Sequence, residues 1–315
     1  MKAGFVALIG RPNAGKSTLL NRLIGTKLAI VSDKPQTTRN RILGVRNYPN
    51  AQVVYLDTPG IHRPLHRMNV RMVDIALQTI AEVDLVAVVV DASQSFGNGD
   101  RYVLDRFKNA QPPVMLVLNK VDMISKPKLL PMIAALNREH SFAEIVPISA
   151  LTGENVDRLE RTVIEHMPDG EPLYPPDYLT DQPERFIVAE MVREQVLQHT
   201  HAEMPFSTAV VVDRFEEPVE RRPQRGSRAG VPERVPQTGL MRLYCTILVE
   251  RESQKPIVIG RGGAMIKQIG TAARHSLERF FDTRVFLDLR VKVRSRWRED
   301  ERALDDLGLR TDPGS

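Results

Sequence analysis

The chain has 315 residues, of which 26% are charged, and this length predicts about two domains. The net charge of +5 and the pI near 9.4 favour an anionic partner. A single cysteine, Cys245, excludes an intrachain disulfide and is typical of a reducing compartment. The apolar runs, such as Leu85–Val90, are too short to cross a bilayer, and we expect no signal peptide because the first predicted strand follows the first residues directly.

The first predicted element is a buried strand, Phe5–Ile9, which leads into a loop that matches the phosphate-binding pattern GxxxxGKS/T. Leu19 and Leu23 then recur at helical spacing. Such a loop turns its N–H groups toward phosphate oxygens, and the helix start adds a positive dipole end. We expect Lys16 to reach the β- and γ-phosphates and the Ser17 hydroxyl to ligate Mg²⁺. The residues expected to contact the nucleotide here are Gly10, Arg11, Pro12, Asn13, Ala14, Gly15, Lys16, Ser17 and Thr18.

A second polar loop follows the apolar strand Val53–Leu56. It begins at Asp57, whose carboxylate we expect to hold the Mg²⁺ shell through water, and continues through Thr58 and Pro59. The N–H of Gly60 is expected to sense the γ-phosphate, and Thr58, Pro59 and Ile61 are expected to contact the nucleotide as well. The preceding run, Ile42–Asn47, predicts an antiparallel edge strand.

The strand Val114–Leu118 ends in the tetrapeptide NKVD, residues 119–122, which predicts a guanine site. The Asp122 carboxylate can accept hydrogen bonds from N1–H and N2–H₂ of guanine, whereas adenine would leave it unpaired and desolvated. Asn119 can tie this loop to the phosphate loop, and the Lys120 stem can lie along the base. Further on, Ile148, Ser149 and Ala150 end another strand and offer a backbone N–H to the guanine carbonyl.

These strands alternate with helical patterns, which predicts an α/β domain with a mostly parallel, doubly wound sheet whose ligand lies at the carboxyl ends of the strands. We place this first domain at 1–167, closed by a helix over 155–167. A Pro-rich linker follows at 168–183, then a smaller α+β domain at 184–300 and a tail at 301–315 with a partial helix. The second domain is expected to contain a helix at 184–199, strands at 206–212 and 243–249, and a disordered insertion at 216–237. We expect the arginines of this insertion to be solvated in a flexible loop rather than to contact RNA.

The second domain carries a glycine-rich turn at 260–263, which resembles the GXXG turn of a KH RNA-binding domain, of type II given the order of its elements. Gly260, Gly262 and Gly263 allow close approach to an RNA backbone, while Arg261 and Lys267 supply positive charge. After the following helix, apolar residues occupy every second position from Val285 to Val293, and basic residues occupy alternate positions from Arg290 to Arg298. This pattern predicts one strand with a row of cations facing RNA phosphates, and a solvated charged face explains it equally well. That row is Arg290, Lys292, Arg294, Arg296 and Arg298. We expect Trp297 to lie on the apolar side of this strand, with packing as its first role and base stacking as its second.

Residues 1–165 look like a translation-factor-class GTPase domain, and the segment Lys34–Ile42 is similar to the first switch of the Era family in particular. This resemblance implies a switch threonine that completes the Mg²⁺ shell, and we favour Thr38 over Thr37. Ile61 stands where Ras-type enzymes place a water-orienting glutamine, so we expect slow intrinsic GTP hydrolysis. Asn13 is shared with GTPases that bind K⁺ beside the phosphates; the alternative is that it only shapes the turn.

The resemblance covers nearly the whole chain. It implies a GTP-hydrolysing switch, with Lys16, Thr38, Asp57, Gly60 and Asn13 at the reaction centre, that binds the 3′ region of 16S rRNA during assembly of the 30S subunit. It also implies a cytoplasmic monomer that does not bind DNA and contacts the inner face of the membrane peripherally. Two alternatives remain: a signalling or translation GTPase with another RNA or protein target, and a non-enzymatic RNA-binding scaffold with a slow nucleotide site.

Overall fold

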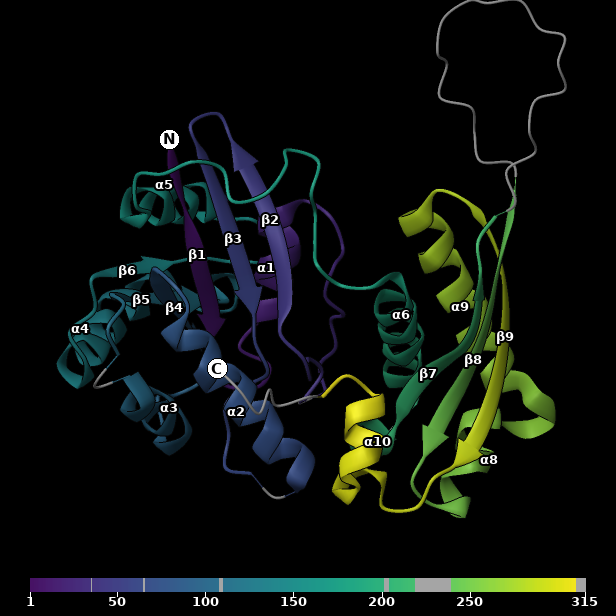
Figure 1. Cartoon of the computed structure of the whole chain (residues 1–315). Helices are drawn as coiled ribbons and strands as arrows, with labels where there is room; N and C mark the ends of the chain where they lie inside the picture. Colours follow the sequence, from purple (N-terminus) through teal and green to yellow (C-terminus); the bar gives the residue numbers. More distant parts are fainter. Residues whose placement is uncertain (35, 65, 108–109, 201–203, 219–238, 310–315) are drawn as a thin grey trace, which may run out of the picture. The chain divides into compact units, whose positions relative to one another are not determined.

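The computed structural model describes the chain except for residues 35, 65, 108–109, 201–203, 219–238 and 310–315 (Figure 1). The chain divides into two compact units. The first contains Met1–Gln182 together with Arg298–Ser315, and the second contains Pro183–Trp297. The chain therefore leaves the first unit once and returns to it at its carboxyl end. Among the described residues, none of the helices has the length and apolar character needed to cross a bilayer.

Six strands form one sheet within the described part of the first unit, in the order β2-β3-β1-β4-β5-β6. β2 is antiparallel to β3 and lies at the edge, as predicted, and the other neighbours are parallel. Buried Val, Ile and Leu side chains occupy both faces of the central strands, as expected for a sheet covered on both sides. The strands are β1 (Lys2–Ile9), β2 (Ile42–Tyr48), β3 (Ala51–Asp57), β4 (Leu85–Asp91), β5 (Val114–Asn119) and β6 (Glu144–Pro147).

Helices cover both faces of this sheet. Ala7 and Ile9 of β1 share a buried cluster with residues of α2, α3 and α4, while α1 and α5 contact the strands from the opposite face. The last helix, α10, is joined to α2 by ion pairs. The helices are α1 (Lys16–Ile24), α2 (Arg67–Ala81), α3 (Asn98–Leu104), α4 (Leu129–Glu139), α5 (Val156–His166) and α10 (Glu301–Asp306).

The Pro-rich segment that follows α5 is attached to the edge of the sheet. The backbone N–H of Val45 donates to Leu179 O at 2.9 Å, and Thr180 Oγ1 donates to Leu43 O at 2.6 Å. The buried Gln52 side chain donates to Tyr174 O at 2.8 Å. The first two bonds occupy backbone groups that the edge strand β2 would otherwise leave open.

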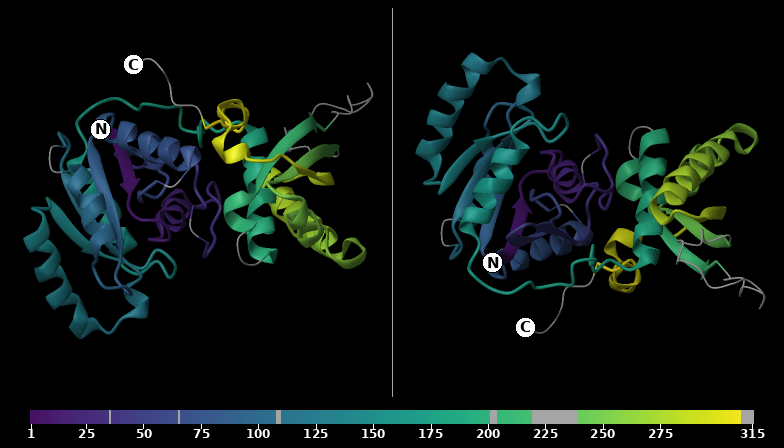
Figure 2. Two further views of the ribbon diagram at one scale, coloured as in Figure 1. Left: turned by 90° about the horizontal axis from the view of Figure 1, so that it is seen from below. Right: turned by 90° about the horizontal axis from the view of Figure 1, so that it is seen from above.

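Three strands form the sheet of the second unit as described, in the order β7-β8-β9. β8 is antiparallel to β7 and parallel to β9, and helices α6 and α9 pack on one face of the sheet (Figures 1 and 2). The elements are α6 (Glu184–His199), α7 (Met204–Ser207), β7 (Ala209–Glu216), β8 (Leu240–Val249), α8 (Lys255–Ile259), α9 (Ala264–Phe281) and β9 (Arg284–Val293).

Two predictions for this unit were wrong. The strand expected from residue 206 begins at Ala209, because α7, with a proline in its first turn, occupies the preceding residues. The expected row of five cations is interrupted: β9 ends at Val293, and Arg296 has a left-handed φ of 52°. Trp297 is buried, as predicted, and its Nε1–H donates to Ser207 O at 3.1 Å. Most of the predicted insertion, residues 219–237, lies outside the described residues.

Candidate functional site

Loops at the carboxyl ends of β1, β3, β5 and β6 line a cavity of about 490 Å³ in the first unit. The register of the sheet explains the convergence, since Leu8 pairs with Asp57 and Asp91 with Asn119. The predicted residues that line the cavity are Pro12, Asn13, Gly15, Lys16, Ser17, Thr18, Thr38, Gly60, Asn119, Lys120, Asp122 and Ala150.

The phosphate loop holds Lys16 in a buried position. Its Nζ donates to Gly10 O at 3.2 Å and to Arg11 O at 3.0 Å. Burial lowers the pKa of Lys16 to about 8, and the negative charge of Asp57 opposes this shift. A phosphate group beside the ammonium would stabilise its charged form and so raise this pKa again. Gly15, with φ of 95°, is required here because a Cβ would lie 2.2 Å from Asn119 Nδ2.

Three oxygen-bearing side chains meet at the start of α1. Ser17 Oγ donates to Asp57 Oδ2 at 2.6 Å, and Thr38 Oγ1 lies 2.7 Å from Ser17 Oγ and 3.3 Å from Asp57 Oδ2. Burial raises the pKa of Asp57, while Lys16 and the two hydroxyls act in the opposite direction. The other oxygen, Asp57 Oδ1, is buried without a hydrogen-bond partner among the described residues. This set of hard oxygen donors fits Mg²⁺.

The two threonines of this segment have different surroundings. Thr38 is 7% exposed and belongs to the oxygen cluster, whereas Thr37 Oγ1 donates to Lys34 O at 2.6 Å within its own loop. The geometry therefore favours Thr38 over Thr37 as the residue that would approach a metal bound by Ser17 and Asp57.

The loops at the base end of the cavity are tied together by Asn119. Its Nδ2 donates to Ala14 O at 2.8 Å, the link to the phosphate loop that the sequence predicts, and its Oδ1 accepts from Ala150 N at 2.9 Å. Lys120 Nζ lies 2.6 Å from Asp91 Oδ2. Asp122 is exposed and lines the cavity, which leaves its carboxylate available to a base.

Not every group in the predicted base loop is free. The N–H of Ser149 donates to Glu154 O at 3.0 Å, that of Ile148 donates to Leu118 O, and that of Ala150 is bound to Asn119. A hydrogen bond from a backbone N–H to the guanine carbonyl therefore stays a prediction. It requires one of these N–H groups to share its hydrogen between two acceptors, or a neighbouring N–H to donate instead.

Close contacts explain the residue types found in the loop after β3. A Cβ at Gly60 would lie 2.6 Å from Pro12 N, so only glycine allows this approach to the phosphate loop. Thr58 is buried and its hydroxyl donates to Leu8 O at 2.9 Å. Ile61 is 1% exposed in the apolar core, and its N–H donates to Gly10 O. Ile61 thus points away from the cavity and cannot orient water there.

Sequence reasoning missed several residues that line this cavity. Gln36 lies within the segment that resembles the first switch, Met123 and Leu151 directly follow predicted loops, and the others lie in segments with no recognised pattern. The missed residues are Ile30, Val31, Ser32, Asp33, Gln36, Gln94, Met123 and Leu151. Asp33 has a clear role, because its carbonyl accepts from Asn13 Nδ2 at 2.6 Å and fixes that side chain in a left-handed turn with φ of 63°. The run of polar residues after Val31 was the available signal.

The second unit presents the predicted GXXG turn between α8 and α9. Gly260 has φ of 75°, and a Cβ there would lie 2.6 Å from Met265 Cβ. Gly262 and Gly263 also have positive φ, but nothing lies within 4 Å of their added Cβ positions, so the approach of a ligand backbone is open there. Arg261 and Lys267 are exposed beside the turn.

The predicted basic residues of β9 do not share a face with the core of the unit. Arg290 and Lys292 lie opposite the α6–α9 face of the sheet, because the alternate residues Leu289, Val291 and Val293 pack under the helices. Arg294 follows the end of the strand, where its N–H donates to Val249 O at 2.9 Å.

Comparison with known proteins agrees with both halves of this description. Residues 5–120 match the family described as 50S ribosome-binding GTPase, and residues 235–298 match the KH domain family. The GTPase Era of Geobacter metallireducens is 50% identical over 307 residues, covering 98% of this chain and 97% of the relative. That of Geotalea uraniireducens is 48% identical over 307 residues with the same coverage.

Two solved structures are similar over 99% of this chain and 100% of their own. Era in complex with MgGDPNP and nucleotides 1506–1542 of 16S ribosomal RNA has 40% identity and a TM-score of 0.90. A variant of Aquifex aeolicus Era bound to GDP·AlF₄⁻ has 39% identity and a TM-score of 0.88. Likeness of sequence and fold thus extends through the nucleotide loops and the KH turn alike, and the chain belongs to the Era family of GTPases.

Proposed function

We propose that this GTPase uses hydrolysis of GTP to switch a KH domain that binds the 3′ region of 16S rRNA during assembly of the 30S subunit. The observation that carries the proposal is the presence, in one chain, of the oxygen cluster at Ser17, Thr38 and Asp57 and of an open GXXG turn. A similar Era structure holds MgGDPNP and a fragment of 16S rRNA, which supports both parts. The domain boundaries proposed for these activities are 1–167, 168–183, 184–300 and 301–315.

In the first domain, the chain's own groups bind and orient the triphosphate. Lys16 and the N–H groups of residues 13–18 would hold the phosphates, and Asp122 would select guanine. Ser17, Thr38 and Asp57 would hold Mg²⁺, which neutralises charge on the phosphates when bound. With Ile61 buried in the core, this chain supplies no side chain at that position to polarise water, and slow intrinsic turnover follows.

We also propose a K⁺ ion beside the phosphates. Asn13 Nδ2 is already bonded to Asp33 O, so Oδ1 of the same amide is the atom that would contact the cation. Turnover of the full chain in KCl and in NaCl tests this point. Equal rates in the two salts would leave Asn13 with the role of shaping the turn alone.

In the second domain, Gly260–Gly263 would clamp the RNA backbone, with Arg261 and Lys267 nearest to the phosphates. Arg290, Lys292 and Arg294 were predicted to extend the same RNA surface. We further propose a monomer that works in the cytoplasm, does not bind DNA and contacts the inner membrane face only peripherally, in keeping with GTP and ribosomal RNA as its ligands.

The deciding experiment measures binding of the full chain to a 3′-terminal 16S rRNA fragment with a non-hydrolysable GTP analogue and with GDP. We expect tighter binding in the GTP state and loss of this difference in Lys16→Ala, with the exposed Lys128→Ala as the matched control. Equal affinity in both nucleotide states would overturn the switch. Crosslinking that recovers chiefly other RNAs would favour a signalling or translation GTPase instead.

A further inference from the structure

The face of the β7–β8–β9 sheet that α6 and α9 leave uncovered is neither apolar nor evenly charged. Buried side chains of β8 and β9 point to the helices, so the alternate residues form this open face. A β-bulge between Val212 and Arg214 adds residues of β7 to it. The members of the open face are Asp213, Arg214, Glu216, Arg242, Tyr244, Thr246, Arg284, Phe286, Asp288, Arg290 and Lys292.

Two aromatic rings lie next to each other on the open face. Phe286 is 45% exposed, and its ring centroid lies 5.9 Å from that of the half-buried Tyr244. The Arg214 guanidinium lies 5.7 Å from the Tyr244 centroid. An exposed phenylalanine on a sheet surface is unfavourable in water, but exposed rings of this kind stack with unpaired nucleobases.

Positive charge surrounds these rings. The open face carries five cations against three carboxylates, those of Asp213, Glu216 and Asp288. Arg290 is paired with Asp288 at 3.4 Å and Arg214 with Glu216. The remaining cations, Arg242, Arg284 and Lys292, have no carboxylate partner among the described residues. Charge of this sign suits phosphates.

A cavity of about 390 Å³ opens beside the Tyr244 ring and is lined by Asp213, Asp288 and Lys292 among others. Asp213 Oδ2 accepts a hydrogen bond from Thr246 Oγ1 at 2.6 Å, which fixes this carboxylate. An aromatic ring with fixed acceptors at its edge can hold a base that donates from an exocyclic amine, and such edge contacts give selectivity in single-stranded RNA.

We propose that the open face binds a second segment of the RNA held by the GXXG turn. Unpaired bases stack on Phe286 and Tyr244, and phosphates contact Arg242, Arg284 and Lys292. The inference rests on the RNA-binding function proposed above. It extends that function to the face of the sheet that the helices leave open. The helix α8, which leads into the GXXG turn, packs against the edge strand β9, so a single-stranded RNA can pass from the turn around this edge.

The test compares two RNAs on the full chain with a GTP analogue bound: a four-nucleotide RNA, which the GXXG turn can hold alone, and the long 3′-terminal 16S fragment. We expect Phe286→Ala to weaken binding of the long RNA by about 5- to 100-fold and to leave the short one unchanged. The triple variant Arg242→Gln/Arg284→Gln/Lys292→Gln should lower the salt dependence of long-RNA binding by a slope of about 2.

The controls separate this proposal from the function on which it rests. Arg261→Gln/Lys267→Gln should weaken both RNAs, and Arg279→Gln, an exposed arginine in the last turn of α9, should affect neither. If the wild type binds both RNAs and the open-face variants behave like wild type, the second surface is refuted while the KH function stands. If the wild type binds neither RNA, both fail. If the variants keep RNA but lose 30S subunits, the face binds protein, which also overturns the proposal.

Discussion

Thr38 Oγ1 lies 2.7 Å from Ser17 Oγ, so a residue of the first switch segment reaches the hydroxyl at the start of α1. Both hydroxyls also contact the same oxygen of Asp57. Three segments far apart in the sequence therefore meet at one point. Any ligand that bridges these oxygens fixes the switch segment relative to the phosphate loop.

Replacement of Thr38 by alanine tests this relationship. We expect Thr38→Ala to lower Mg²⁺-dependent GTP hydrolysis by about 10- to 100-fold, the range typical of lost groups that hold or orient a metal. Thr37→Ala is the matched control, since that hydroxyl donates to Lys34 O within its own loop. Single-turnover rates over a range of Mg²⁺ concentrations measure the effect. Equal losses in the two variants would contradict the assignment.

Asp122→Asn should change the choice of base. An asparagine amide cannot accept from both N1–H and N2–H₂ of guanine, but its N–H₂ can donate to the 2-carbonyl of xanthine. Loss of two charge-assisted hydrogen bonds at about 1.5–3 kcal/mol each predicts about 10²- to 10⁴-fold weaker GTP binding and a gain for XTP. Competition with labelled GDP measures both. A variant that still prefers GTP would show that guanine is selected elsewhere.

Ile61→Gln should not create a faster enzyme. The Ile61 side chain lies in the core, so glutamine must either bury its amide or displace the loop after β3. Burial of an unpaired amide predicts a loss of about 1–3 kcal/mol in the free energy of unfolding. Denaturation and turnover are measured on the same preparation. A rise in turnover without a loss of stability would place this side chain in the cavity instead.

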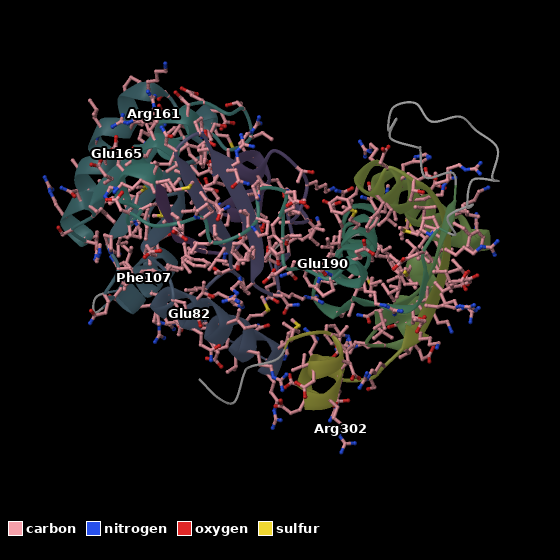
Figure 3. All side chains as sticks on the ribbon, turned by 45° about the horizontal axis from the view of Figure 1, so that its top comes forward. Glu82, Phe107, Arg161, Glu165, Glu190 and Arg302 are labelled. Atoms are coloured by element: carbon pink, nitrogen blue, oxygen red, sulfur yellow. The ribbon has the colours of Figure 1, made fainter. Side chains whose placement is uncertain are left out.

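The tail depends on Arg71 of α2. Its guanidinium pairs with Glu301 and Asp305 and donates to Leu309 O at 2.6 Å. Arg71→Ala should release α10, and we expect its amides to exchange about 10- to 100-fold faster, which corresponds to local loss of about 1.4–2.8 kcal/mol. Arg302, which points outward from α10, provides the control Arg302→Ala (Figure 3). Unchanged exchange in Arg71→Ala would mean that apolar packing alone holds the tail.

Docking of the tail should also depend on pH. Burial acts to raise the pKa of Glu299, but the bonds from His66 and the Arg67 N–H outweigh it and lower that pKa below its usual range. A lowered carboxyl pKa stabilises the folded state above the unfolded value, and this contribution is lost as pH falls through the folded value. The protection factors of the α10 amides, which are corrected for the intrinsic pH dependence of exchange, should therefore fall at acidic pH in the wild type and change less in Glu299→Gln. Identical pH profiles would exclude Glu299 as the titrating group.

Much of the first unit could be predicted from the sequence because its signals are local. The apolar runs mark the strands, and the phosphate loop must follow β1 directly for its glycines to approach Asn119. The order of the sheet then brings Asp57 and Asn119 to one edge. By contrast, Ile30, Ser32 and Gln94 enter the cavity from loops whose paths depend on tertiary packing, so no pattern indicates them.

The errors in the second unit have physical causes that alternation cannot reveal. Basic residues recur at every second position from Arg290 to Arg298, yet the chain leaves the sheet after Val293 and turns at Arg296 with a positive φ unusual for arginine. Burial of Trp297 in the core beneath that turn accompanies the departure. Period-two patterning thus located the strand and its apolar face but not its end.

Cys245 gives a test of the second unit's core. Burial raises the pKa of its thiol from 9.0 to about 12, and the nearby carboxylates of Asp213 and Asp288 add to the effect. Since the thiolate is the reactive form, the native protein should resist iodoacetamide at pH 8 and react only as fast as it unfolds. A raised thiol pKa gives stability that is complete below about pH 9 and is lost as pH rises from about 9 to about 12. The free energy of unfolding of the wild type should therefore fall more steeply over this interval than that of Cys245→Ala. Rapid alkylation at pH 8 in the absence of denaturant, or parallel slopes in the two proteins, would show that the thiol is open to water.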